Sequence, residues 1–198
     1  MNLTKVWPSV SSRLLALIPL AVAINVAIGR IVAELSLPVY LDAVGTVLVS
    51  ALAGLGAGVV TGLIGQVLTS FVSGYVWLAF APIQVLIAVL AFVAARRGGF
   101  KNVGLSIAWG GVLGLLGGAL SAVISYLAFK GVTAGGVTFV TTILVGIGLD
   151  LPWAITVSSI TTDVLDKALA FALVGVALRS LPLRMISRYP LALRAVGR

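Results

Sequence analysis

A chain of 198 residues that is 61% hydrophobic and only 9% charged cannot cover a water-soluble surface, since soluble domains carry about 25% charged residues. It has no cysteine and no histidine, which excludes disulfides, thiolate nucleophiles and the commonest zinc ligands. The net charge of +8 comes from basic residues in short loops and at the chain ends, which is typical of membrane topology rather than nucleic-acid binding. We therefore expect one all-α polytopic membrane domain over residues 1–198, without a cofactor or a metal.

The first apolar segment begins like a signal peptide. Lys5 and Arg13 precede it, and the triplet Ala21-Val22-Ala23 resembles a cleavage site. However, the apolar run continues to Ala33, which is long enough to cross a bilayer. We expect it to be kept as a first membrane-spanning helix over residues 13–33.

Five further spans are expected along the chain, which gives six in total. The second and third together fill only about 30 residues, which is short for two spans of about 20 residues each. At least one of this pair should therefore be short or bent. The expected ranges are 41–54, 57–72, 78–95, 104–129 and 152–178.

The basic residues predict the orientation of these spans. With six spans, the opposite side receives Glu34, Asp42 and Asp150, with Lys130 and Arg30 as its basic residues. Because Lys and Arg concentrate in cytoplasmic loops, we expect both termini in the cytoplasm. The basic residues on the expected cytoplasmic side are Lys5, Arg13, Arg96, Arg97, Lys101, Arg179, Arg184, Arg188, Arg194 and Arg198.

Small residues recur four apart in three of the spans. They are found in Ala23-Ile-Asn-Val-Ala27, in Gly58-Val-Val-Thr-Gly62, and at Gly110, Gly114 and Gly118. Such spacing lets helices approach closely in lipid. Internal packing is the first interpretation of these motifs, and docking to another membrane subunit is the second.

The last span differs from the others because it has a polar face. Three charges near a helix centre cost roughly 8–10 kcal/mol to insert into a bilayer, so this face must look at protein or water. At 100° per residue, one half of its circumference carries Thr156, Ser158, Ser159, Thr162, Asp163, Asp166 and Lys167.

Two interpretations of the charges remain open. Asp163 and Lys167 are four apart in the favourable order for an ion pair, whereas Asp166 has no local partner. The group either fixes packing, with Asp166 hydrogen-bonded to a neighbouring helix, or places Asp163 at the floor of an outward-facing polar pocket. In the second case Asp166 and Lys167 serve packing or coupling.

The sequence comes close to two enzyme motifs but contains neither of them in full. Asp163-Val-Leu-Asp166 begins like the motif of membrane CDP-alcohol phosphotransferases, but Lys167 stands where that motif needs glycine. Gly146-Ile-Gly-Leu-Asp150 is one residue longer than the G-x-G-D of intramembrane aspartyl proteases. We therefore expect no catalytic residues and no enzyme activity.

The whole chain resembles the substrate-binding S component of an energy-coupling factor (ECF) type ABC transporter. The resemblance is carried by the alanine motif at 23–27 and by the run 37–46 that leads into the glycine-rich stretch 53–62. The closing segment, from Asp166-Lys-Ala-Leu-Ala-Phe171 to Leu181-Pro-Leu-Arg184, is similar as well.

This resemblance implies a multi-pass protein of the bacterial cell membrane that binds a vitamin or related micronutrient from outside. Its expected partners are a transmembrane T component, which Ala23 and Ala27 would face, and two cytoplasmic ATPase subunits that drive uptake. The alternative is a membrane-embedded ligand-sensing module coupled to a signalling protein.

The expected substrate contacts come from the outer loops and the outer halves of the last three spans. The aromatic residues among them have an equally good second interpretation, as belt residues at the membrane interface. The candidates are Tyr40, Asp42, Trp77, Gln84, Tyr126, Trp153, Thr156, Ser159 and Asp163.

Overall fold

The computed structural model describes residues 12–130, 136–189 and 191–198, and these form helices and turns without any strand. The expected all-α class is therefore confirmed. In chain order the helices are α1 (Ser12–Glu34), α2 (Val44–Ala53), α3 (Leu55–Ser73), the 3-10 helix η2 (Tyr75–Phe80), α4 (Ala81–Arg96), α5 (Val103–Phe129), α6 (Gly136–Gly146), α7 (Leu151–Ser180), α8 (Leu183–Ile186) and α9 (Ala192–Val196). Lys5, on which the signal-peptide comparison drew, lies outside the described residues.

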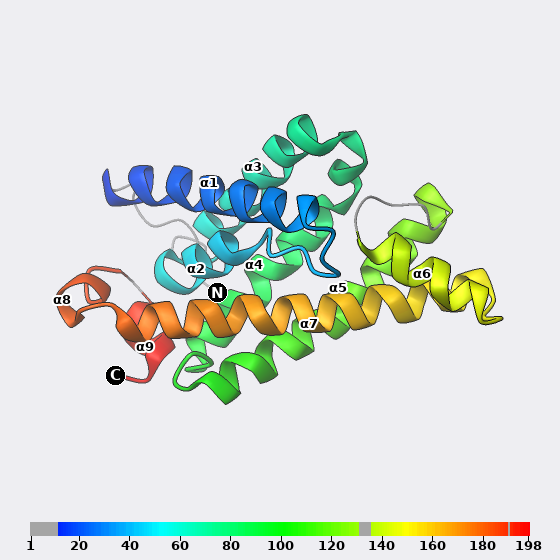
Figure 1. The fold of residues 1–198 in the computed structure, drawn as a ribbon. Helices are drawn as coiled ribbons and strands as arrows, with labels where there is room; N and C mark the ends of the chain where they lie inside the picture. Colours follow the sequence, from blue (N-terminus) through cyan, green and yellow to red (C-terminus); the bar gives the residue numbers. More distant parts are fainter. Residues whose placement is uncertain (1–11, 131–135, 190) are drawn as a thin grey trace, which may run out of the picture.

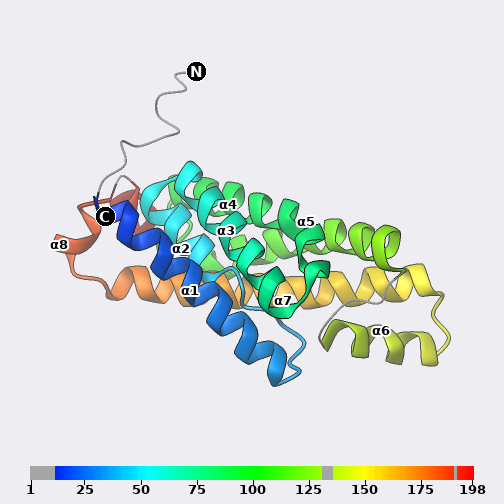
Figure 2. The same cartoon turned by 90° about the horizontal axis from the view of Figure 1, so that it is seen from above.

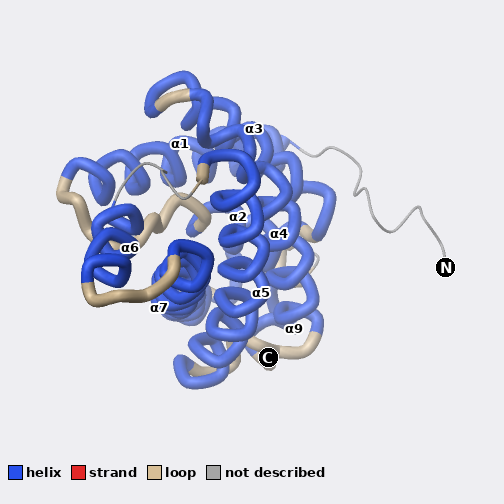
Figure 3. The backbone as a smooth tube through the Cα atoms, turned by 90° about the vertical axis from the view of Figure 1, so that its right-hand side faces the viewer, coloured by secondary structure: helices blue, strands red, loops and turns tan. Residues whose placement is uncertain are grey.

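Successive long helices run back and forth along one direction, as Figures 1 and 2 show. Figure 3 looks along this direction and shows α7 end-on beside α6. Judged by length and composition, four helical stretches could cross a membrane: Ala16–Glu34, Leu55–Ser73, Tyr75–Arg96 and Val103–Phe129. The existence of six spans stays a prediction.

The two remaining expected spans depart from the common pattern. Helix α2 has only 10 residues, which confirms that one member of the second and third pair is short. Helix α7 has 30 residues, but every 18-residue window within it contains Asp163, Asp166 and Lys167. The polar face predicted for this helix is turned inward: these three residues are buried, as are Ser158, Ser159 and Thr162.

Helices α5 and α7 pack with their backbones in near contact. A Cβ atom added at Gly118 would lie 2.6 Å from the Cα atom of Ile160, and added Cβ atoms at Gly110 and Gly114 would also collide with the α7 backbone. Only glycine permits such an approach. The internal-packing interpretation of this glycine repeat is confirmed.

Helix α6 was not expected. It packs against α7, where Thr141 Oγ1 and Ser158 Oγ lie 2.7 Å apart. With 11 residues it is too short to span a bilayer. A sequence prediction that looks only for membrane spans therefore does not find it. The short helices α8 and α9 were missed for the same reason.

Several basic segments meet at one end of the bundle. The Phe100 N–H donates to the Ala195 carbonyl (3.0 Å), and the Leu191 N–H donates to the Leu52 carbonyl (3.3 Å). Arg179 Nη1 donates to the Phe100 carbonyl (3.1 Å). The α4–α5 loop, the end of α7 and the C-terminal segment therefore lie together, next to the end of α2.

Candidate functional site

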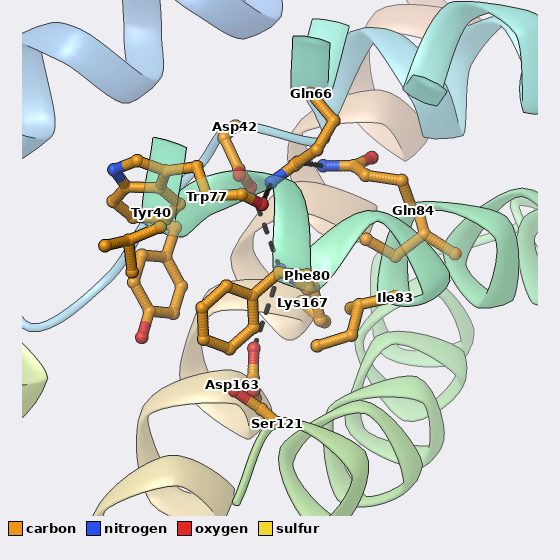
Figure 4. Close-up of a pocket in the computed structure, with 12 residues that line it drawn as sticks. Tyr40, Asp42, Gln66, Trp77, Phe80, Ile83, Gln84, Ser121, Asp163 and Lys167 are labelled. Carbon is orange, nitrogen blue, oxygen red and sulfur yellow. Dashed lines mark hydrogen bonds and ion pairs between the residues drawn. The ribbon is translucent and has the colours of Figure 1, made fainter. Parts of the chain in front are cut away.

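A small cavity lies inside the bundle. It is lined by the α1–α2 connection, η2 and parts of α3, α4, α5 and α7 (Figure 4). Its volume is about 40 Å³, which is room for one or two water molecules. The lining residues are Tyr40, Asp42, Gln66, Val76, Trp77, Phe80, Ile83, Gln84, Ile87, Ser121, Asp163 and Lys167.

Lys167 lies at the centre of a group of three carboxylates. Its Nζ forms an ion pair with Asp166, lies 3.6 Å from Asp163 Oδ1 and lies 4.0 Å from Asp42 Oδ1. Lys167, Asp163 and Asp166 are all buried. The expected Asp163–Lys167 pair is present, but the prediction that Asp166 has no local partner was wrong. Neighbouring side chains on a helix usually diverge, and the flexible Lys167 stem overcomes that divergence here.

Asp166 also holds the α1–α2 connection against α7. Its Oδ1 accepts hydrogen bonds from the Tyr40 N–H (2.9 Å) and the Leu41 N–H (2.6 Å). Leu41 has a φ of 48°, a left-handed conformation that bulky residues rarely adopt. These charge-assisted bonds stabilise that turn and place Tyr40 and Asp42 on the cavity. The expected partner of Asp166 was a neighbouring helix, and the actual partner is a connecting loop.

A chain of hydrogen bonds crosses the buried helices behind the cavity. Asn25 Nδ2 donates to Thr46 Oγ1 (2.9 Å), and Thr46 Oγ1 donates to Gln84 Oε1 (3.2 Å). Gln84 Nε2 donates to Gln66 Oε1 (3.2 Å), and Gln66 Nε2 donates to the Trp77 carbonyl. Both glutamine amides are therefore oriented by protein partners before any ligand arrives.

Aromatic rings form one wall of the cavity. Tyr40 and Trp77 meet edge to face with centroids 5.9 Å apart, and Trp77 lies 6.3 Å from Phe80. Lys167 Nζ lies 5.7 Å from the centroid of the Tyr40 ring, within the range of a cation–π contact. Within the described chain, the Trp77 indole N–H is buried and has no hydrogen-bond partner. The wall can therefore contact a flat ring, and its Trp77 N–H is a hydrogen-bond donor without a partner.

The structure brings together five of the nine substrate-contact candidates. Tyr40, Asp42, Trp77, Gln84 and Asp163 all line the cavity. The other four lie elsewhere: Tyr126 and Thr156 on a shallow groove between α5 and α7, Trp153 66% exposed at the start of α7, and Ser159 buried beside Gly118.

Three polar residues of the cavity were absent from the predicted set. They are Gln66, Ser121 and Lys167. Polar side chains inside apolar spans are costly and often functional, so Gln66 and Ser121 could have been found by that criterion. Lys167 was noticed but was assigned to packing or coupling.

Ala23 and Ala27 are both exposed, on a separate apolar groove between α1 and α3. Asn25 stands between them in sequence yet is buried, with 1% of its surface exposed. Its side chain starts the hydrogen-bond chain described above. The polar residue inside the alanine motif therefore leaves the outer face of α1 apolar.

No protein-family model, curated protein or solved structure matches this chain.

Proposed function

We propose that the chain is the S component of a bacterial ECF-type importer. It lies in the cell membrane as a multi-pass protein and captures a vitamin or related small micronutrient from outside. A transmembrane T component and two cytoplasmic ATPase subunits complete the transporter and supply the energy, and the chain itself catalyses no reaction. One observation carries the proposal: a polar, aromatic-walled cavity lies inside a helix bundle whose outer surface is largely apolar.

The position of the cavity supports capture from outside. Gln66 and Ser121 lie in the last halves of α3 and α5, and Trp77 and Gln84 lie in η2 and the start of α4. All four positions are remote from the end where the basic segments meet. With that basic end in the cytoplasm, as we propose for all six passes, the cavity lies in the outer half of the membrane.

The small volume of the cavity implies that a covering segment moves when substrate enters. The α1–α2 connection and η2 are the non-α-helical parts of its wall. The connection is held by Asp166, by Lys167, which lies near Asp42 and the Tyr40 ring, and by the Tyr40–Trp77 contact. These few contacts are what must open to admit a ring-sized ligand.

The outer face of α1 is the proposed docking site for the T component. Ala23 and Ala27 are exposed there, on an apolar groove that α3 completes. Small residues allow a partner helix to approach closely, and among the described side chains no charged one lines the groove.

The test is purification of the tagged chain from its native membrane in mild detergent, followed by mass spectrometry. We expect a T component and two ATPases. The double variant Ala23→Trp/Ala27→Trp should lose them, because the large rings prevent close docking. Ala108→Trp on α5 is the matched control, since Ala108 is also an exposed alanine on a membrane helix. Recovery of a signalling protein instead would support the sensing module.

A further inference from the structure

The charges around the cavity do not balance. Three carboxylates, those of Asp42, Asp163 and Asp166, surround one ammonium group, that of Lys167, within 4.0 Å. With all four groups ionised the cluster carries two excess negative charges. Uncompensated charge inside a membrane protein is costly and usually has a partner.

The excess negative charge belongs to Asp42 and Asp163 rather than to Asp166. Asp166 pairs with Lys167 and accepts two backbone hydrogen bonds. Asp163 and Asp42 lie 3.6 and 4.0 Å from Lys167 Nζ, which is beyond hydrogen-bond distance. Both line the cavity, so their oxygen atoms are available to a ligand.

Besides the carboxylates, the cavity lining includes the Trp77 indole N–H, which has no partner in the described chain, and the Ser121 hydroxyl. Ser121 is 6% exposed and lines the cavity from α5, and its hydroxyl makes no hydrogen bond to any part of the chain that the structure describes. In the view of Figure 4 it is drawn on the same side of the cavity as Asp163. Gln66 and Gln84 differ from it, because their amides are already bonded to each other and to their neighbours.

The free charged groups of the cavity, Asp42 and Asp163, are therefore acceptors, and the cavity wall is aromatic. Among the described residues, no group of three or more Asp, Glu, His or Cys side chains is arranged to hold a metal ion, since the Lys167 ammonium stands between the carboxylates. Tyr40, Trp77 and Phe80 offer ring faces and edges, which attract flat rings and cations.

Resting on the proposed function, we infer that the substrate is an organic cation: a flat ring bearing a positively charged group with N–H donors. The charged group binds between Asp42 and Asp163, and Ser121 accepts from it or donates to a ring atom. The ring lies against Tyr40, Trp77 and Phe80. The cation then supplies the positive charge that Lys167 alone does not.

Three probes of one shape and different charge test this inference. Benzamidinium is cationic, benzamide is its neutral counterpart and benzoate is its anionic counterpart. The full-length protein in lipid nanodiscs is titrated with each by calorimetry. Benzamidinium should bind about tenfold or more tighter than benzamide, because charge-assisted hydrogen bonds are roughly twice as strong as neutral ones. Benzoate should bind weakest.

Two variants test whether Asp163 causes the preference for benzamidinium over benzamide. Asp163→Asn keeps the shape of the side chain and removes its charge, so the preference for benzamidinium over benzamide should fall by about tenfold. Glu34→Gln is the control, because Glu34 is an acid in an exposed pair with Arg30 and lies outside the cavity. It should leave the preference unchanged. The comparison of the three probes needs no variant, so it stands even where Asp163→Asn folds poorly.

The outcomes separate this inference from the function on which it rests. Equal binding of the three probes, tighter binding of benzoate, or no benzamidinium binding up to about 10 mM would overturn the cationic substrate. Recovery of the T component and ATPases in those same preparations would leave the proposed function standing. Absence of these partners, with the charge preference intact, would overturn the importer and leave a cation-binding membrane protein.

Discussion

Replacing Asp166 with alanine removes the acceptor of two backbone hydrogen bonds and the nearest counter-ion of a buried lysine in one step. Asp166 has no exposed surface, so water cannot take over these roles. Hydrogen bonds to charged groups contribute about 1.5–3 kcal/mol each, and breaking a buried ion pair costs about 3–5 kcal/mol. These losses overlap, so we expect Asp166→Ala to lower the free energy of unfolding by about 3–5 kcal/mol.

The assay is reversible unfolding in mixed micelles, followed by circular dichroism or by tryptophan fluorescence. Asp166→Asn separates the two roles of the side chain, because its carbonyl oxygen still accepts from the Tyr40 and Leu41 N–H groups while the charge is gone. It should lose about half as much as alanine. Glu34→Ala removes an acid from an exposed pair with Arg30 and should have little effect. A loss for Asp166→Ala no larger than that for Glu34→Ala would refute the role assigned to Asp166.

Two further changes test the packing and the hydrogen-bond chain. Gly114→Ala places a Cβ atom 2.6 Å from the Asp163 carbonyl oxygen, so it should lower the melting temperature and weaken ligand binding, whereas Gly111→Ala meets open space and should do neither. Equal melting temperatures for the two alanines would contradict the tight α5–α7 contact. Gln66→Leu leaves the Gln84 amide without its acceptor and should cost about 1–3 kcal/mol of stability, measured by the same unfolding assay. Unchanged stability would mean that this chain of bonds is not needed.

The sequence was informative where a periodic pattern decides the structure. Glycines four apart on α5 indicated a close helix contact, and the structure has one. The clustering of polar residues on one half of the last helix predicted its buried face. Both features depend on residues within a single helix, whose geometry is fixed.

The site was less predictable because it is assembled from distant segments. The bond from the Tyr40 N–H to Asp166 joins residues 126 positions apart, and no local pattern indicates it. Tyr126 and Trp153 satisfied the criterion of outer aromatic residues, yet neither lines the cavity. Which aromatic residue turns inward depends on tertiary packing, which composition does not specify.

The glycine contact between α5 and α7 has a consequence for the proposed binding of substrate in the cavity. Because no side chain separates the two backbones along that contact, the two helices pack as one closely fitted pair. Ser121 and Asp163 stand on this pair, whereas Tyr40, Asp42 and Trp77 stand on the connection and on η2. The proposed binding surface thus divides into a template on α5 and α7 and a cover, formed by the connection and η2, that must move to admit the proposed substrate. Substitutions on the template should change which molecules bind, and substitutions on the cover should change how long they stay.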